Sequence, residues 1–306
     1  MTDYKKIIDA QTWAFIERTN AFYPPEATTL SVARQRNVYN RMCEAFNAGR
    51  PAGVSARDSF VPALRRRIAL RIYRMDDSSP SATIMYFHGG GFVVGGLESH
   101  DDVCAELCSR TGFRVISVDY RLCPEHPHPA AFEDARDATI WAAGLYEGRM
   151  ILCGDSAGGN LAAAVCGALR HEIAIAGQVL IYPGLGGDRT KGSYVTHANA
   201  PMLTLDEVNA YAAMRTGGVE RDGDPTVAPL ADDAFLGLPQ TEIFSAECDP
   251  LCDDGRDYRD ALLAAGCNAA WHVESGLVHG YLRARHTADR ASASFDRIVA
   301  ALKRMG

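Results

Sequence analysis

One serine in the chain has the neighbours that a nucleophilic serine needs. The run GDSAG at residues 154–158 follows the apolar stretch 150–153 and precedes an alanine-rich stretch. This is the pattern G-x-S-x-G in a strand–turn–helix setting, where glycines let chain segments pass closely and the sharp turn exposes the hydroxyl. The first N–H groups of the helix then stabilise developing negative charge. We expect Ser156 to be a nucleophile for acyl transfer. The alternative is an ordinary glycine-rich turn between a strand and a helix.

A glycine run supplies the second feature that acyl transfer requires. The run HGGGF at residues 88–92 comes directly after the apolar stretch that ends at Phe87. Consecutive glycines leave backbone N–H groups free to donate to a developing oxyanion. A flexible loop or a phosphate cradle are the alternatives. The nucleotide-binding pattern G-x-x-x-x-G-K-[ST] is absent and no lysine follows, so the two motifs together predict a hydrolase.

A serine nucleophile needs a base, and the chain offers several histidines after Ser156. In an enzyme of this kind the order along the chain is serine, acid, histidine. His279 stands before Gly280 in a turn-like stretch after the final expected strand, where a loop can carry imidazole to the serine. His272 lies inside that strand and is expected to be structural, and His286 lies near the final helix. The remaining histidines after the serine are His171 and His197.

The group that orients the base is expected at the end of another strand. Asp249 follows an apolar stretch and precedes Pro250, so it stands at a boundary between strand and loop. Asp253 and Asp254 open the next helix and are expected to be N-terminal caps. Asp155, beside the nucleophile, is expected to be a buried, hydrogen-bonded support.

The elements that must position these residues alternate along the chain. We expect strands at 68–73, 83–87, 114–118, 150–153, 178–182, 242–246 and 269–273, and helices at 130–146, 156–170, 253–265 and 288–303. This alternation predicts an α/β fold with a mostly parallel central sheet and helices on both faces.

Two segments interrupt this alternation. Residues 1–50 form an amphipathic helical segment in two pieces, the second at about 31–46. Residues 184 to about 228 are rich in glycine and polar residues, with one helical patch at 205–214, and active-site lids are often insertions of this kind. We therefore divide the chain into a helical segment (1–50) and an α/β core (51–306) with an insertion at about 184–228.

Five motifs in the same order resemble the hormone-sensitive-lipase-like group of α/β-hydrolases, whose bacterial members are esterases. They are the runs 88–92 (HGGGF), 119–127 (DYRLCPEHP), 154–159 (GDSAGG), 249–251 (DPL) and 279–280 (HG), and the likeness extends from about residue 84 to the C-terminus. The resemblance implies an α/β-hydrolase fold with a helical cap made of the N-terminal segment and the insertion. Cys123 departs from the usual alanine of the group.

The resemblance also implies a catalytic triad of Ser156, His279 and Asp249. It implies an oxyanion hole from the N–H groups of Gly90, Gly91 and Ala157, and an acyl-enzyme intermediate formed on small, short-chain carboxylic esters. No cofactor is required by this chemistry. An amidase, deacetylase or formamidase that uses the same triad stays open. A non-catalytic ligand receptor is the other alternative, but related receptors lack the histidine that stands here at position 279.

Composition and charge exclude some classes of partner and indicate a cellular location. The 306 residues are 47% hydrophobic, with a net charge of −7, which argues against non-specific nucleic-acid binding and against a basic membrane patch. No signal-like stretch and no apolar run of membrane-spanning length is present, so we expect a cytoplasmic protein. The nine cysteines lack zinc-site spacing and are expected to be reduced, with no metal bound. Related esterases suggest a homodimer, for which the edge of the final strand is a candidate interface.

Overall fold

The inner strands of the central sheet are mostly apolar on both faces. Among the residues that the computed structural model describes (2–24, 30–63, 66–221 and 223–306), eight strands pair in the order β1-β2-β4-β3-β5-β6-β7-β8. Pairing is parallel from β4 through to β8, while β2 is antiparallel to both β1 and β4. The strands are β1 Val54–Ala63, β2 Arg66–Met75, β3 Ala82–Phe87, β4 Arg114–Asp119, β5 Arg149–Asp155, β6 Ile175–Ile181, β7 Gln240–Cys248 and β8 Ala269–Val278. The predicted α/β fold with a mostly parallel sheet is confirmed.

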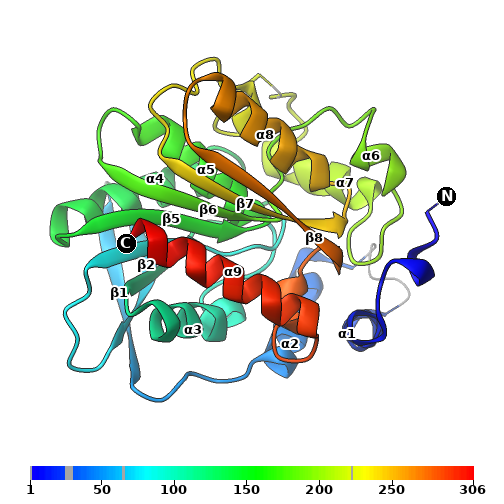
Figure 1. Cartoon of the computed structure of the whole chain (residues 1–306), viewed down its shortest axis with the longest axis horizontal. Coiled ribbons are helices and arrows are strands. Elements are labelled where there is room, and N and C mark those ends of the chain that lie inside the picture. The colour runs from blue at the N-terminus through cyan, green and yellow to red at the C-terminus, as the bar shows by residue number, and fades with distance from the viewer. Residues whose placement is uncertain (1, 25–29, 64–65, 222) are drawn as a thin grey trace.

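Helices cover both faces of this sheet (Figure 1). Alternate residues of one strand enter different cores: Ile84 and Tyr86 pack with α3 (Asp101–Thr111) and α9 (Asp289–Met305). Met85 and Phe87 pack on the opposite side, where α4, α5 and α8 lie. This two-residue period is the expected consequence of strand geometry in a sheet that is buried on both faces. The helices of that second face are α4 Ala130–Leu145, α5 Ala157–Leu169 and α8 Cys252–Ala264.

Four further helices lie beyond the carboxyl ends of the parallel strands, outside the two layers (Figure 1). Two belong to the N-terminal segment, α1 (Ala10–Asn20) and α2 (Val32–Phe46), and two to the insertion, α6 (Ser193–Thr196) and α7 (Leu205–Thr216). The predicted helical pieces at 31–46 and 205–214 are thereby confirmed. Met1 and residues 25–29 of the N-terminal segment lie outside the described residues. Short 3₁₀ helices occur at η1 Tyr4–Lys6, η3 Glu98–His100, η4 Pro229–Ala231 and η5 Tyr281–Ala284.

One strand was not expected from the sequence. β1 pairs along its whole length with β2 and forms one edge of the sheet. Its residues are mostly half-buried or exposed, and Pro62 stands near its end. A half-exposed edge strand that contains proline gives neither a continuous apolar run nor a regular alternation, so its sequence pattern is weak.

Candidate active site

Ser156 stands at the turn between β5 and α5. Its φ is +53°, in the left-handed region that side chains rarely adopt. The turn depends on two glycines without side chains, because a Cβ on Gly158 would collide with the carbonyl oxygen of Phe87, and one on Gly154 with the carbonyl oxygen of Gly158. The strand–turn–helix setting predicted for Ser156 is confirmed, and the turn directs its hydroxyl into a cavity.

His279 and Asp249 lie in line with this serine. The Nε2 atom of His279 is 2.8 Å from the Oγ atom of Ser156, although 123 positions separate the two residues in the sequence. The Nδ1 atom of His279 is 2.6 Å from Oδ2 of Asp249. Asp249 is fully buried, and its other oxygen accepts the N–H of Leu251 at 2.9 Å. The three residues directly follow β5, β7 and β8, and parallel pairing places the carboxyl ends of these strands on the same side of the sheet.

The glycine run, residues 88–92, directly follows the carboxyl end of β3, on the same side of the sheet. The φ angles of Gly90 and Gly91 are +125° and +60°, and a Cβ on Gly90 would collide with the carbonyl oxygen of Val94. Both glycines and Ala157 line the cavity at Ser156. Within the described residues, no group accepts a hydrogen bond from the N–H of Gly90, Gly91 or Ala157. Three backbone donors are therefore available at the cavity wall.

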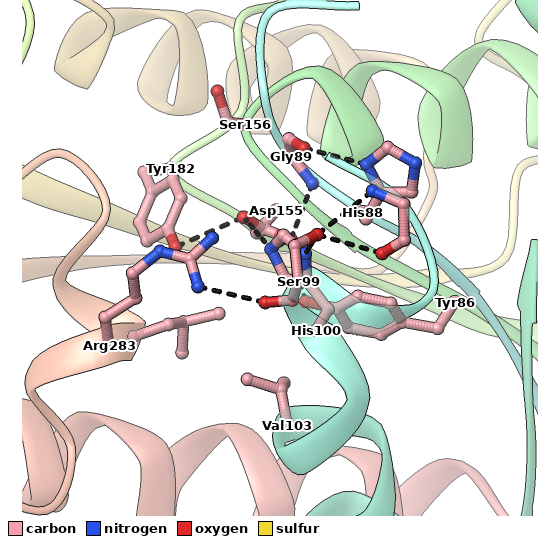
Figure 2. A network of polar contacts seen from close by, with 12 residues as sticks. Tyr86, His88, Gly89, Ser99, His100, Val103, Asp155, Ser156, Tyr182 and Arg283 are labelled. Atoms are coloured by element: carbon pink, nitrogen blue, oxygen red, sulfur yellow. Dashed lines mark hydrogen bonds and ion pairs between the residues drawn. The ribbon is translucent and has the colours of Figure 1, made fainter. Parts of the chain in front are cut away.

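A buried polar network lies next to the nucleophilic turn and centres on Asp155, the residue before Ser156 (Figure 2). Its carboxylate accepts the hydroxyl of Tyr86 at 2.7 Å, and it accepts the N–H of Gly89, which precedes the two donor glycines, at 3.0 Å. Nε2 of His100 lies at 3.3–3.4 Å from the two carboxylate oxygens. Burial opposes ionisation of Asp155, but the charge and hydrogen bond of His100 and the bond from Tyr86 hold the pKa of Asp155 well below its ordinary value. Asp155 is thus the hydrogen-bonded support that was predicted.

Arg283 connects this network to the N-terminal helices. Arg283 is half-buried, and its guanidinium donates to the carbonyl oxygen of Ser99 at 3.0 Å (Figure 2) and to the hydroxyl of Tyr39, on α2, at 2.7 Å. Arg283 stands four residues after His279, in η5. The loop that carries the histidine is thereby fastened to α2, a contact that no sequence pattern pointed to.

The cavity that Ser156 and His279 share has a volume of about 660 Å³, within the range typical of small-molecule sites. Its walls are mainly apolar and come from both helical segments. Tyr194 and Met202 line it. Trp13 and Phe15 of α1 are not among its lining residues, and Phe15 packs against Phe46. Further lining residues are Tyr23, Tyr39 and Met42 from the first segment and Leu203, Tyr211 and Arg215 from the second.

Two expectations about aspartates in the first turn of α8 were wrong. Asp253 and Asp254 are not N-terminal caps, since α8 begins at Cys252. Asp254 is buried and accepts the N–H of Leu185 at 2.6 Å and the hydroxyl of Tyr194 at 3.1 Å. Asp253 accepts the N–H of Ser193 at 3.0 Å. Both carboxylates hold the 184–228 segment, and such long-range partners cannot be inferred from a helix-start pattern.

The two other histidines in this part of the chain, His272 and His286, have other partners. His272 pairs with Glu242 at 2.6 Å and stacks on Phe244, as expected of a residue inside β8. His286 pairs with Glu106 at 3.0 Å. No group of three or more potential metal ligands occurs among the described residues. In the same ranges, none of the helices combines the length and the apolar character that crossing a membrane demands.

Comparison with known proteins gives consistent matches. Residues 84–283 match the model of a family described as having the alpha/beta hydrolase fold. Esterase LipI of Mycobacterium tuberculosis is 37% identical over 248 residues, which cover 77% of this chain and 78% of that protein. An ethyl acetate hydrolase of Pseudomonas putida is 32% identical over 77% of this chain and 78% of its own.

Solved structures agree with these sequence matches. A Pyrobaculum calidifontis esterase superposes with a TM-score of 0.86 at 33% identity and covers 90% of this chain and 94% of its own. A thermostable esterase of Pseudomonas putida gives a TM-score of 0.91 at 26% identity, with 98% of both chains covered. The chain therefore belongs to the α/β-hydrolase family and is a carboxylesterase of the hormone-sensitive-lipase-like group.

Proposed function

We propose that this carboxylesterase hydrolyses small, short-chain esters with Ser156 as nucleophile, His279 as base and Asp249 as the acid that orients the base. The observation that carries the proposal is the continuous contact from Ser156 Oγ through His279 to Asp249, at 2.8 and 2.6 Å. Both distances are within hydrogen-bond reach, which a serine and its base need for proton transfer.

The reaction proceeds in two steps. His279 takes the proton of Ser156 while Oγ attacks the ester carbonyl, and Asp249 fixes the imidazole tautomer and stabilises the imidazolium. The carbonyl oxygen becomes an oxyanion and accepts hydrogen bonds from the N–H groups of Gly90, Gly91 and Ala157. His279 then gives the proton to the leaving alcohol, and an acyl-enzyme remains. A water that His279 deprotonates attacks this ester, and the acid leaves as Ser156 regains its proton.

We also propose that residues 1–50 and about 184–228 together form a cap over this site. Both segments supply walls of the same cavity. Arg283 binds the first segment to the part of the chain that follows His279, and Asp254 binds the second segment to the part that follows Asp249. A cavity of about 660 Å³ favours compact substrates, and one relative is named for the hydrolysis of ethyl acetate. The cytoplasmic location and a homodimer through the edge strand β8 stay predictions.

The test is turnover of p-nitrophenyl acetate, butyrate and laurate by the wild type and by Ser156→Ala. We expect rapid wild-type turnover of the two short esters, slow turnover of laurate, and a loss of about 10⁴-fold or more in kcat in the variant. Near-normal turnover by Ser156→Ala would exclude Ser156 as the nucleophile. Preference for laurate would exclude the short-chain assignment while leaving the triad intact.

A further inference from the structure

Arg215 is the buried side chain of an otherwise exposed or half-buried helix. Every residue of α7 is described, and Arg215 is the one that is buried, with 6% of its surface exposed. No carboxylate among the described residues lies within ion-pair distance of its guanidinium; its hydrogen bonds go to two backbone carbonyls and one amide oxygen. Burying a cation costs free energy, and the described contacts of Arg215 that offset this cost are to neutral oxygen acceptors.

One side of the guanidinium contacts residues 88–92, which we call the glycine loop. Its central carbon lies 3.8 Å from the centre of the Phe92 ring, which is within the range of a cation–π contact. Phe92 directly follows Gly91, and its carbonyl oxygen accepts the N–H of Cys123 at 2.8 Å. The thiol of Cys123, in turn, lies 3.8 Å from the carbonyl oxygen of Arg215. Phe92 is therefore held on one side by Cys123 and on the other by the arginine.

The other contacts of Arg215 reach the helix that begins beside the nucleophile. Nη2 donates to the side-chain oxygen of Asn160 at 3.0 Å. Asn160 lies in the first turn of α5, where its N–H donates to the carbonyl oxygen of Ser156 at 3.1 Å. Nη1 donates to the carbonyl oxygen of Val227 and Nη2 to that of Thr226, in the loop at the end of the insertion. One side chain thus contacts the cap, the glycine loop and the start of α5.

Arg215 keeps its charge at neutral pH despite this environment. Burial lowers the pKa of Arg215 to about 10, which is still well above 7. The planar guanidinium can stack on a ring and donate in its own plane at the same time, and an ammonium group cannot do both.

We propose that Arg215 is a positioning residue, which fixes the glycine loop and the N-terminus of α5 relative to each other so that the N–H groups of Gly91 and Ala157 converge on one oxygen. The inference rests on the oxyanion hole proposed above. Donors of an oxyanion hole act on the transition state, and a small misplacement weakens them without weakening substrate binding equally. Arg215 touches neither donor, so it acts through Phe92 and Asn160.

The test compares Arg215→Met and Arg215→Lys with a matched control, Arg170→Met. Arg170 stands just after the opposite end of α5 and is also largely buried, where it pairs with Asp232 at 2.5 Å. For each variant, kcat and KM are measured with p-nitrophenyl butyrate, together with the inhibition constant of phenylboronic acid. A boronic acid forms a tetrahedral adduct with a nucleophilic serine and so reports on the oxyanion hole. Urea unfolding measures stability.

Arg215→Met is expected to lower kcat about 10-fold or more and to raise the inhibition constant of phenylboronic acid by a similar factor. KM is expected to change less than about 3-fold. Arg215→Lys is expected to recover part of both losses, because an ammonium can still reach one carbonyl acceptor. Arg170→Met is expected to lower stability and leave both quantities near wild type. Equal kcat and boronate affinity in Arg215→Met and Arg170→Met would overturn the proposal.

A second variant covers the case in which Arg215→Met does not fold. Phe92→Leu removes the ring and leaves the three hydrogen bonds of Arg215, and we expect kcat and boronate affinity to fall together by about 3-fold or more. Unchanged values would overturn the proposal. Ser156→Ala separates this inference from the function that it rests on. Turnover by Ser156→Ala would refute the triad. If Ser156→Ala is inactive and Phe92→Leu keeps wild-type values, only the role of Arg215 is refuted.

Discussion

The ring of Tyr211 lies directly against the backbone of Gly91. A Cβ built on Gly91 would stand 2.6 Å from Cδ1 and 2.7 Å from Cγ of Tyr211, closer than such atoms approach in proteins. The side chain of a residue of α7 therefore leaves room only for glycine at position 91, which lines the cavity. With Arg215 on Phe92 one turn later, α7 contacts two consecutive residues of the glycine loop.

Gly91→Ala is expected to lower kcat about 10²-fold or more. The new methyl group must displace either the Tyr211 ring or the loop, and a displaced loop would move the N–H of residue 91 out of the proposed oxyanion hole. Steady-state kinetics with p-nitrophenyl acetate measures the loss.

Gly112→Ala is the control for backbone strain. Gly112 has a φ of +76°, near the +60° of Gly91, but nothing lies within 4 Å of its missing Cβ. It ends α3, away from the cavity, so alanine is expected to lower stability by about 1 kcal/mol and to leave kcat unchanged. Equal kcat in the two alanine variants would show that the contact with Tyr211 is unimportant.

Tyr211→Ala is expected to shift the preference of the enzyme toward longer esters. The ring lines the cavity beside Gly91, and its removal enlarges the cavity next to the proposed oxyanion hole. The ratio of kcat/KM for laurate to that for acetate should rise about 10-fold or more. Tyr211→Phe keeps the ring and should leave the ratio within about 3-fold of wild type. An unchanged ratio in the alanine variant would place the chain-length limit elsewhere.

Asp249→Asn is expected to reduce kcat about 10³–10⁴-fold with little change of fold. The amide keeps the size of the carboxylate, but it neither stabilises the imidazolium nor fixes the tautomer of His279. Asp253→Asn serves as the comparison, since Asp253 stands in the same part of the chain and binds Ser193 and Arg256. Comparable losses in both variants would argue that the loop, and not the carboxylate of Asp249, matters.

Asp254 is expected to make stability fall as pH rises. Burial raises the pKa of Asp254 to about 7, against the hydrogen bonds from Leu185, Gly186 and Tyr194. The folded chain thus binds this proton more tightly than the unfolded chain. The resulting stabilisation is complete below about pH 4 and is lost as pH rises through about 7.

Asp254→Asn removes this titration and keeps one acceptor oxygen for the same donors. Between pH 5.5 and 8.5 the variant should gain about 1–2 kcal/mol in unfolding free energy relative to the wild type, as measured by urea unfolding at both pH values. A constant difference between the two proteins across this range would mean that Asp254 does not titrate there.

The sequence was sufficient wherever the determining interactions are local. The turn at Ser156 depends on glycines two residues away on either side, so the motif alone predicts the strand, the turn and the helix. Asp249 could be proposed as the acid because it stands at the end of an apolar stretch, and His279 as the base because it follows the final expected strand. The order serine, acid, histidine along the chain agrees with both choices. The catalytic roles of these residues stay predictions until the variants are measured.

The contacts around the site were not predictable because they join residues far apart in the sequence. Asn160 and Arg215 are separated by 55 positions, and neither belongs to a chemical pattern. Asp254 at the start of a helix has the appearance of a cap, but its partners come from the loop after β6. β1 is stabilised by pairing with β2 along its length, and such a partner is invisible in the composition of one strand.

The placement of β8 affects how the enzyme responds to heat. β8 carries His279 at its end and pairs with β7, and no other described strand adjoins it. Strands at the border of a sheet open at lower free energy than those at its centre. On warming, the imidazole should leave the serine while β3, β5 and their helices are still ordered. Thermal inactivation should therefore precede melting, and it should be reversible on cooling for as long as the interior remains folded.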